Sequence, residues 1–278
     1  MIINIEISPP ANKTFFDFFS LIKFIILQSQ QTLNNYIMKN LILFLLFSGS
    51  LIAQQSEVVY ENIIITPLKS SENLLIQGIK KHNQKYHSKG ETTASLYSVL
   101  VGKHSGKYVW LNGPMKMADY DNMPDAAHME DWQKNVRNNA TDESVKIAKL
   151  NWDASYSPPS WGSPKYILWR TFKIKQDNDS YQKVLEAITK IGKVLNTINA
   201  PNPRRVYESV FRSEDREDIT LVYPFKTFTR FSESNGLPEG FEVEYDRING
   251  PGAFRKDVGD VLSLHTNGWH DEVLMLVE

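Results

Sequence analysis

Two histidines that lie close together in the sequence have the clearest potential for chemistry. His82 and His87 stand five residues apart, among Lys81, Lys85 and Lys89. An imidazole here could act as a general base or as a haem ligand, because its charge and coordination change near neutral pH. The same pattern is also typical of a solvated helix end, where cationic groups interact favourably with the helix dipole. We take His82 and His87 as candidate catalytic residues and keep the solvated helix end as the alternative.

Aromatic residues form a second group of candidates. Tyr97, Tyr108 and Trp110 lie on two consecutive segments with strand-like composition, and Trp132 follows in a helix-like stretch. Flat side chains on one face of a sheet that lines a barrel could stack on a flat ligand. Aromatic residues are also common in hydrophobic cores. These four residues are therefore candidate ligand contacts, with core packing as the alternative.

Carboxylates gather in the short segment Asp119-Tyr120-Asp121-Asn122. They could act as a base or hold a hard cation such as calcium, but Asp and Asn also stabilise turns through bonds to their own backbone. We favour the turn and keep Tyr120 as a further candidate ligand contact. His128 lies one helical turn before Asp131, yet two residues at this spacing are a weak metal signal and the sequence shows no third ligand. We predict no metal site.

The composition limits the remaining chemistry. A net charge of −1 gives no basic field for a phosphate backbone, so we expect no nucleic-acid partner. The chain has no cysteine, which excludes disulfides, thiolate catalysis and cysteine-ligated metals. It also has no phosphate-binding glycine loop, no HExxH motif and no GxSxG elbow. Nucleotide-dependent and serine-hydrolase functions are therefore disfavoured.

The N-terminal residues are expected to lie outside the folded body. Lys39 precedes the apolar run 41–47, and small residues end at Ala53, which is typical of a secretory signal peptide over 38–53. The run is shorter than the about 20 residues that span a bilayer, so we expect membrane contact only if the segment stays uncleaved. We expect residues 1–37 to be translated upstream of a true start at Met38. The mature protein would then be exported, to the periplasm or the extracellular space.

The elements that must position the candidate residues follow one order twice, βαββαβ. In the first unit, 58–157, we predict a strand, a helix, a hairpin, a helix and a strand at 58–67, 74–86, 95–111, 125–135 and 149–156. The second unit, 165–278, opens with a strand, a helix and a hairpin at 166–172, 181–198 and 206–223. A proline-rich linker at 158–164 separates the two units.

Two local likenesses support a duplication. The segment 117–120 after the first hairpin corresponds to 228–231 after the second, and 132–136 resembles 269–273. On this alignment few residues remain for a final strand in the second unit. Either the natural chain is longer, or residues 272–277 form that strand.

Two such units in one chain resemble the dimeric α/β-barrel superfamily, over residues 58–278. The segment 82–87 and the turn 119–122 are similar to short motifs of secreted NIPSNAP-like and antibiotic-biosynthesis-monooxygenase-like proteins. The resemblance implies an α+β fold in which tandem duplicated ferredoxin-like units form a pseudo-dimeric α/β barrel within one chain. The superfamily includes cofactor-free oxygenases, haem-dependent enzymes and small-molecule binders, so haem remains open as a cofactor.

Three functions follow from these observations. The first is binding of a small apolar or aromatic molecule in the barrel, which we favour because no convergent acid, base and orienting group is visible in the sequence. The second is a cofactor-free or haem-dependent monooxygenase-like enzyme that uses His82 or His87. The third is a structural or interaction domain, which a fully packed barrel interior would favour.

Overall fold

The structure, a computed structural model, describes residues 57–88, 93–122, 124–159, 164–232 and 236–277. The expected upstream extension 1–37, the expected signal peptide 38–53 and residues 160–163 of the expected linker lie outside these ranges, and the predictions on them stay predictions. Among the described helices, none has the length and apolar character that a membrane crossing requires.

The first half of the described chain contains four strands and two α-helices, with short 3₁₀ turns η1 (Met117–Asp121) and η2 (Arg137–Asn139). The predicted first strand agrees with the structure because it carries a β-branched run, Ile63-Ile64-Ile65-Thr66, and ends at Pro67. In chain order the elements are β1 (Val59–Pro67), α2 (Glu72–Tyr86), β2 (Ala94–Val101), β3 (Tyr108–Met115), α3 (Ala126–Asn135) and β4 (Ala140–Tyr156).

The second half follows the same order, but the connection between its last two strands contains more helix. The turn η3 (Phe228–Phe231) occupies the place of η1, and a π-helical segment η4 (Arg255–Gly259) leads into the last helix. The elements are β5 (Tyr166–Ile174), α4 (Ser180–Thr197), β6 (Arg204–Ser209), β7 (Ile219–Phe225), α5 (Phe241–Asn249), α6 (Asp260–His265) and β8 (Thr266–Leu276).

The eight strands form one closed antiparallel barrel in the order β1-β3-β2-β8-β5-β7-β6-β4. Within each half the order is that of a ferredoxin-like sheet, and the two sheets join where β2 pairs with β8 and where β4 pairs with β6. In the described part of the chain, each strand therefore has a neighbour on both sides, and the sheet has no free edge strand. The α+β class and the closed barrel are therefore confirmed.

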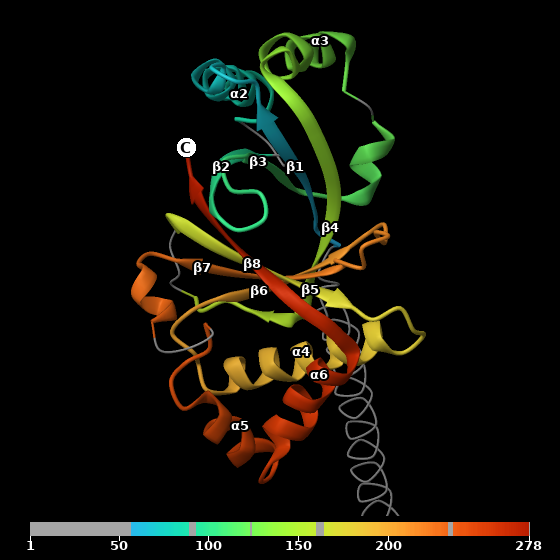
Figure 1. Ribbon diagram of the computed structural model, residues 1–278, viewed down its shortest axis with the longest axis vertical. Coiled ribbons are helices and arrows are strands. Elements are labelled where there is room, and N and C mark those ends of the chain that lie inside the picture. Colours follow the sequence, from blue (N-terminus) through green and yellow to red (C-terminus); the bar gives the residue numbers. More distant parts are fainter. Residues whose placement is uncertain (1–56, 89–92, 123, 160–163, 233–235, 278) are drawn as a thin grey trace, which may run out of the picture. The chain divides into compact units, whose positions relative to one another are not determined.

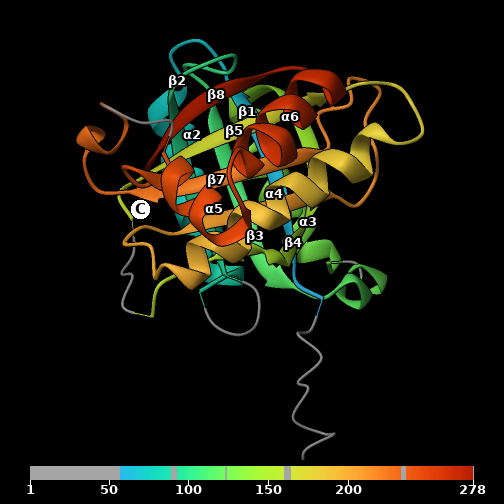
Figure 2. The same cartoon turned by 90° about the horizontal axis from the view of Figure 1, so that it is seen from below.

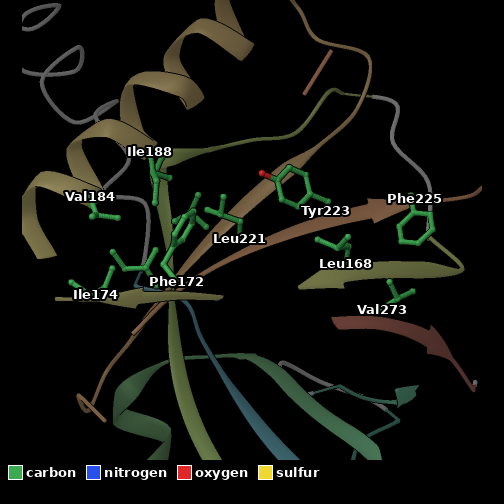
Figure 3. Packing of buried hydrophobic residues seen from close by; sticks show 12 residues of the cluster. Leu168, Phe172, Ile174, Val184, Ile188, Leu221, Tyr223, Phe225 and Val273 are labelled. Carbon is green, nitrogen blue, oxygen red and sulfur yellow. The ribbon is translucent and has the colours of Figure 1, made fainter. Parts of the chain in front are cut away.

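Helices cover the outside of the barrel in two separate layers (Figure 1). The helices α2 and α3 lie over the sheet of the first half, and α4, α5 and α6 lie over the sheet of the second half. The view from below shows α4, α5 and α6 in front of the strands (Figure 2). In the second layer Val184 and Ile188 of α4 pack against Phe172 and Leu221 of the strands (Figure 3). Both faces of each sheet are thus covered, one by helices and one by the opposite sheet.

One predicted likeness is wrong. The segment Trp269–Val273, aligned with the helical residues 132–136, lies in strand β8, where it pairs with β5. The difference has a topological reason, because β8 must close the barrel between β5 and β2. The helices of this connection, α5 and α6, come before Trp269 in the chain. Of the two alternatives for the final strand, the one within residues 272–277 is confirmed, since β8 runs to Leu276. The strand predicted at 149–156 is longer and begins at Ala140.

Candidate functional site

The barrel encloses a cavity of about 780 Å³ between its two sheets. Alternate residues line it, because successive side chains of a strand point to opposite faces. On β1 these residues are Tyr60, Asn62 and Ile64, and on β5 they are Ile167, Trp169 and Thr171. The volume lies within the range of about 300–1,000 Å³ that is typical of small-molecule sites. The barrel interior is therefore a candidate binding site.

Part of the cavity wall is apolar. Val99, Val109, Ile167, Val222 and Leu274 form a buried cluster between the two sheets. Partly buried residues pack against this cluster, and several of them also line the cavity: Ile64, Tyr97, Trp169 and Tyr207. Such a wall can bind an apolar or aromatic body by removing it from water.

Three tyrosines and an arginine form a polar group on the cavity wall. Tyr60, Tyr97 and Tyr207 all lie close enough to Arg205 to interact electrostatically with it, and the rings of Tyr60 and Tyr207 meet edge to face at 5.5 Å. Burial raises the pKa of each of the three phenols, and the Arg205 cation only partly offsets this effect. The phenols therefore stay protonated at neutral pH. Each phenol O–H can therefore donate a hydrogen bond to a ligand oxygen.

A second polar group on the cavity wall is largely engaged with itself. Glu217 accepts from Lys103 Nζ at 3.3 Å, and its backbone oxygen accepts from Lys146 Nζ. Glu272 Oε1 lies 2.9 Å from both the backbone nitrogen and Nδ1 of His104. Burial lowers the pKa of Lys146, against the opposing effect of nearby carboxylates. Because these charged groups already have partners within the protein, we interpret them as stabilising the loops at the cavity.

The structure separates the predicted aromatic candidates. Tyr97 lines the cavity as expected. Tyr108 and Trp110 lie on the other face of the sheet and pack with Trp132 in the core beneath α2 and α3. Alternation puts these two side chains on the same face of β3, and that face is turned away from the cavity. Because β3 is buried on both faces, the sequence pattern does not reveal which face is turned toward the cavity. Tyr120 lies in η1 with its hydroxyl buried. Burial of the hydroxyl, and to a smaller extent the nearby Glu61 carboxylate, raises the pKa of Tyr120.

His82 and His87 lie at the end of α2, as expected, but this part of the helix end is not solvated. Both are buried, with exposed fractions of 0% and 7%. Burial, together with the neighbouring imidazoles of His82 and His128, lowers the pKa of His87 to about 4. Burial also lowers the pKa of His82. The interpretation as solvated cations is therefore wrong, because both side chains are buried away from water.

A haem does not fit at these histidines. An iron-ligating imidazole needs an open slot for the flat porphyrin beside its ring. The ring centroids of Trp110, His82 and His128 lie 5.1 to 5.2 Å from that of His87. These three rings leave no slot of porphyrin size beside the His87 ring, and we derive no chemistry through haem at this position.

The third histidine of this cluster was not selected from the sequence. His128 lies next to His82 and His87, and in the described part of the chain these three residues form the group of ligand-type side chains able to hold a metal ion. The only sequence signal was the helical spacing of His128 and Asp131 on one face of α3. The contact with His82, 46 residues away, comes from the packing of α3 on α2.

Comparison with known proteins supports the fold alone. No family model and no characterised protein sequence matches this chain. A candidate monooxygenase from Fusobacterium nucleatum superposes with a TM-score of 0.51 at 9% identity, over 81% of this chain and 94% of that one. An anthrone oxidase-like protein superposes with a TM-score of 0.51 at 12% identity, over 81% and 93%. Chlorite dismutase from Candidatus Nitrospira defluvii in complex with imidazole reaches 0.44 at 10% identity, over 78% and 90%, and this likeness supports no inference.

Proposed function

We propose that this protein binds a small molecule with an aromatic or apolar body and an anionic, oxygen-bearing group in the barrel cavity. The observation that carries the proposal is the cavity of about 780 Å³, whose wall combines apolar side chains with three protonated phenols around Arg205. Arginine and phenol donors suit a carboxylate, since bonds to a charged acceptor are stronger than neutral ones. Ile64, Ile167 and Trp169 would contact the body of the ligand.

Native mass spectrometry of the purified protein tests whether the cavity holds a ligand. Protein purified under mild conditions should carry a bound molecule or take one up from a panel of aromatic carboxylates. Because Trp169 lines the cavity, uptake should also change the tryptophan fluorescence. A protein that binds no member of the panel and carries no molecule from the cell would contradict the proposal.

The role of Arg205 gives the proposal its chemical specificity. Arg205→Gln should weaken binding of a carboxylate about tenfold or more, because a hydrogen bond to a charged group contributes roughly 1.5–3 kcal/mol. The neutral amide of the same ligand should bind both proteins about equally. Arg247→Gln is the matched control, because Arg247 is exposed on α5 and pairs with Glu244. Equal loss for acid and amide would remove Arg205 from ligand recognition.

An oxygenase-like enzyme is the second candidate, supported by the similarity of the fold to a candidate monooxygenase and to an anthrone oxidase-like protein. The cavity could hold an aromatic substrate for such a reaction. Consumption of oxygen in the presence of a bound ligand would favour it over simple binding. The open cavity argues against the third function, a structural domain with a fully packed interior.

We also propose two features of the origin and processing of the chain. The first is export of the mature protein after cleavage near Ala53, which N-terminal sequencing of the natural product would test. The second is origin of the two halves by duplication, which the shared order of elements in the two halves supports.

A further inference from the structure

Three histidines outside the barrel converge from two helices. His82 stands in the last turn of α2, His87 caps that helix, and His128 lies in the first turn of α3. Asp125 fixes the start of α3, because its side chain accepts a hydrogen bond of 2.8 Å from the backbone nitrogen of His128. None of the three lines the barrel cavity, so the cluster takes no part in the proposed ligand site.

The ring nitrogens of the cluster lie at distances close to those of a metal site. His128 Nε2 is 3.0 Å from His82 Nε2, and one nitrogen of each ring lies within 4.8 Å of the others. In a tetrahedral site with metal–nitrogen bonds of about 2.1 Å, the ligand nitrogens are roughly 3.4 Å apart. Small rotations of the rings would therefore bring all three nitrogens onto one ion.

A carboxylate orients the central ring. Asp131 Oδ2 lies 2.9 Å from His82 Nδ1, and Asp131 Oδ1 lies 3.6 Å from the ammonium of Lys85. An ionised carboxylate accepts a hydrogen bond, so it fixes the tautomer with hydrogen on Nδ1 and leaves the Nε2 lone pair facing His128. Metal-binding histidines commonly have such a carboxylate partner on the nitrogen that does not bind the metal.

The polar atoms of His87 lack the partners that burial normally requires. His87 is 7% exposed, and neither of its ring nitrogens has a hydrogen-bond partner within the described residues. Buried polar atoms in folded proteins almost always have one, so this imidazole calls for an explanation. A coordinated ion would use the lone pair of one nitrogen. The ring of Tyr86 stacks on that of His128 with centroids 4.1 Å apart and covers one side of the cluster.

We propose that His82, His87 and His128 bind one divalent late transition-metal ion, with zinc as the first expectation. Imidazole nitrogens suit zinc, copper and nickel, whereas calcium and magnesium prefer oxygen ligands. The set has three neutral ligands and neither a thiolate nor a carboxylate, so the bound ion keeps its positive charge. Three protein ligands also leave a fourth position for water or a substrate oxygen, as in catalytic rather than structural zinc sites.

Metal titration of the full chain, purified without a histidine tag and freed of metal with a chelator, tests this site. Calorimetry should show one Zn²⁺ per chain, and Co²⁺ should give the intense visible absorption of a four-coordinate ion. His87→Ala should lower the zinc affinity by more than the roughly 10- to 100-fold that loss of an outer-shell partner costs. The control is His265→Asn, which changes an imidazole bonded to Ser180 in the second half and should keep the wild-type affinity.

The outcomes separate this site from a purely structural histidine cluster. No zinc uptake by the wild type at micromolar concentration would overturn the proposal, and so would an equal loss in His87→Ala and His265→Asn. If His87→Ala does not fold, the wild-type cobalt spectrum decides, because six-coordinate or absent bands exclude the three-histidine site. Ligand uptake in the barrel cavity does not depend on this result, so failure of one proposal leaves the other intact.

Discussion

The two helix layers that cover the barrel have the same place in the fold and different interiors. Under α2 and α3, apolar residues such as Leu75 and Ile79 give way to three imidazoles at the helix ends, two of them buried and one half-buried. Under α4, α5 and α6, apolar residues continue into a second cluster around Tyr245 and Phe241. The buried cation there, Arg204, donates to the backbone oxygens of Ala154 and Ile188.

The difference teaches that one architecture serves two purposes in this chain. In the second layer burial mainly provides stability, because apolar side chains fill the space and the buried Arg204 donates to two backbone oxygens. In the first layer, the unpartnered ring nitrogens of His87 cost stability unless a ligand uses them. Function here resides in particular side chains and not in the fold that both layers share.

The largest expected effect is on stability in the second layer. Ile188→Ala should lower the free energy of unfolding by about 2–5 kcal/mol, because Ile188 is fully buried between α4 and the sheet and its truncation leaves a cavity. Chemical denaturation measures the change. Zinc affinity should stay at the wild-type value. Val243→Ala, at a site 72% exposed, is the control and should change stability by less than about 0.5 kcal/mol.

A glycine pair sharpens the comparison between the layers. A Cβ at Gly78 would lie 1.9 Å from the Asn135 oxygen of α3, and one at Gly192 would lie 2.4 Å from the Ala154 oxygen of β4. Either alanine variant should therefore lose about 1–3 kcal/mol of stability, despite the better helix propensity of alanine. Only Gly78→Ala should also weaken zinc binding, since only it displaces α3. Equal zinc affinity in the two variants would show that the spacing of α2 and α3 does not matter to the cluster.

Asp131→Asn tests the orientation of His82. An amide presents a weaker acceptor to Nδ1 of His82, so the zinc affinity should fall about 10- to 100-fold by calorimetry. Asp257→Asn is the matched change in the second layer, where Asp257 contacts Lys190 at 3.2 Å and Tyr245 at 3.4 Å. It should leave the zinc affinity unchanged. A similar loss in both variants would point to general loosening of the fold.

The smallest expected effect is a gain in stability. Gly259 has helical dihedral angles, with φ of −59°, and a Cβ there would meet no atom within 4 Å. Gly259→Ala should therefore raise the free energy of unfolding by about 0.4–1 kcal/mol, because alanine restricts the unfolded chain. Thermal and chemical denaturation both measure this. A loss of stability would mean that the π-helical segment before α6 needs the freedom of glycine.

The sequence predicts most of the fold because its local signals agree with one another. Alternating strands, the amphipathic stripe of α4 and the turn residues place most elements within a few residues. The predicted likeness of Trp269–Val273 to a helix is wrong because it compares residue types and not the period of the apolar positions. In β8, His270 and Glu272 line the cavity while Val273 joins the core outside the sheet, which is a period of two.

The site was less predictable for a physical reason. Alternation on β3 separates Trp110 from Val109 but cannot tell which face lies inside, because both are buried. The residues selected from the sequence therefore include one cavity residue, Tyr97, and miss Tyr60 and Tyr207. The contact between His82 and His128 depends on how two helices pack, and no spacing within either helix encodes it.

The most direct test of the difference between the two layers is X-ray diffraction at the zinc absorption edge, on crystals of the full chain grown with one equivalent of Zn²⁺. We predict one anomalous peak, bonded to nitrogens of His82, His87 and His128 at about 2.0–2.1 Å, and none beneath α4, α5 and α6. Absence of a peak at the three histidines, with zinc elsewhere or not bound, would contradict the account.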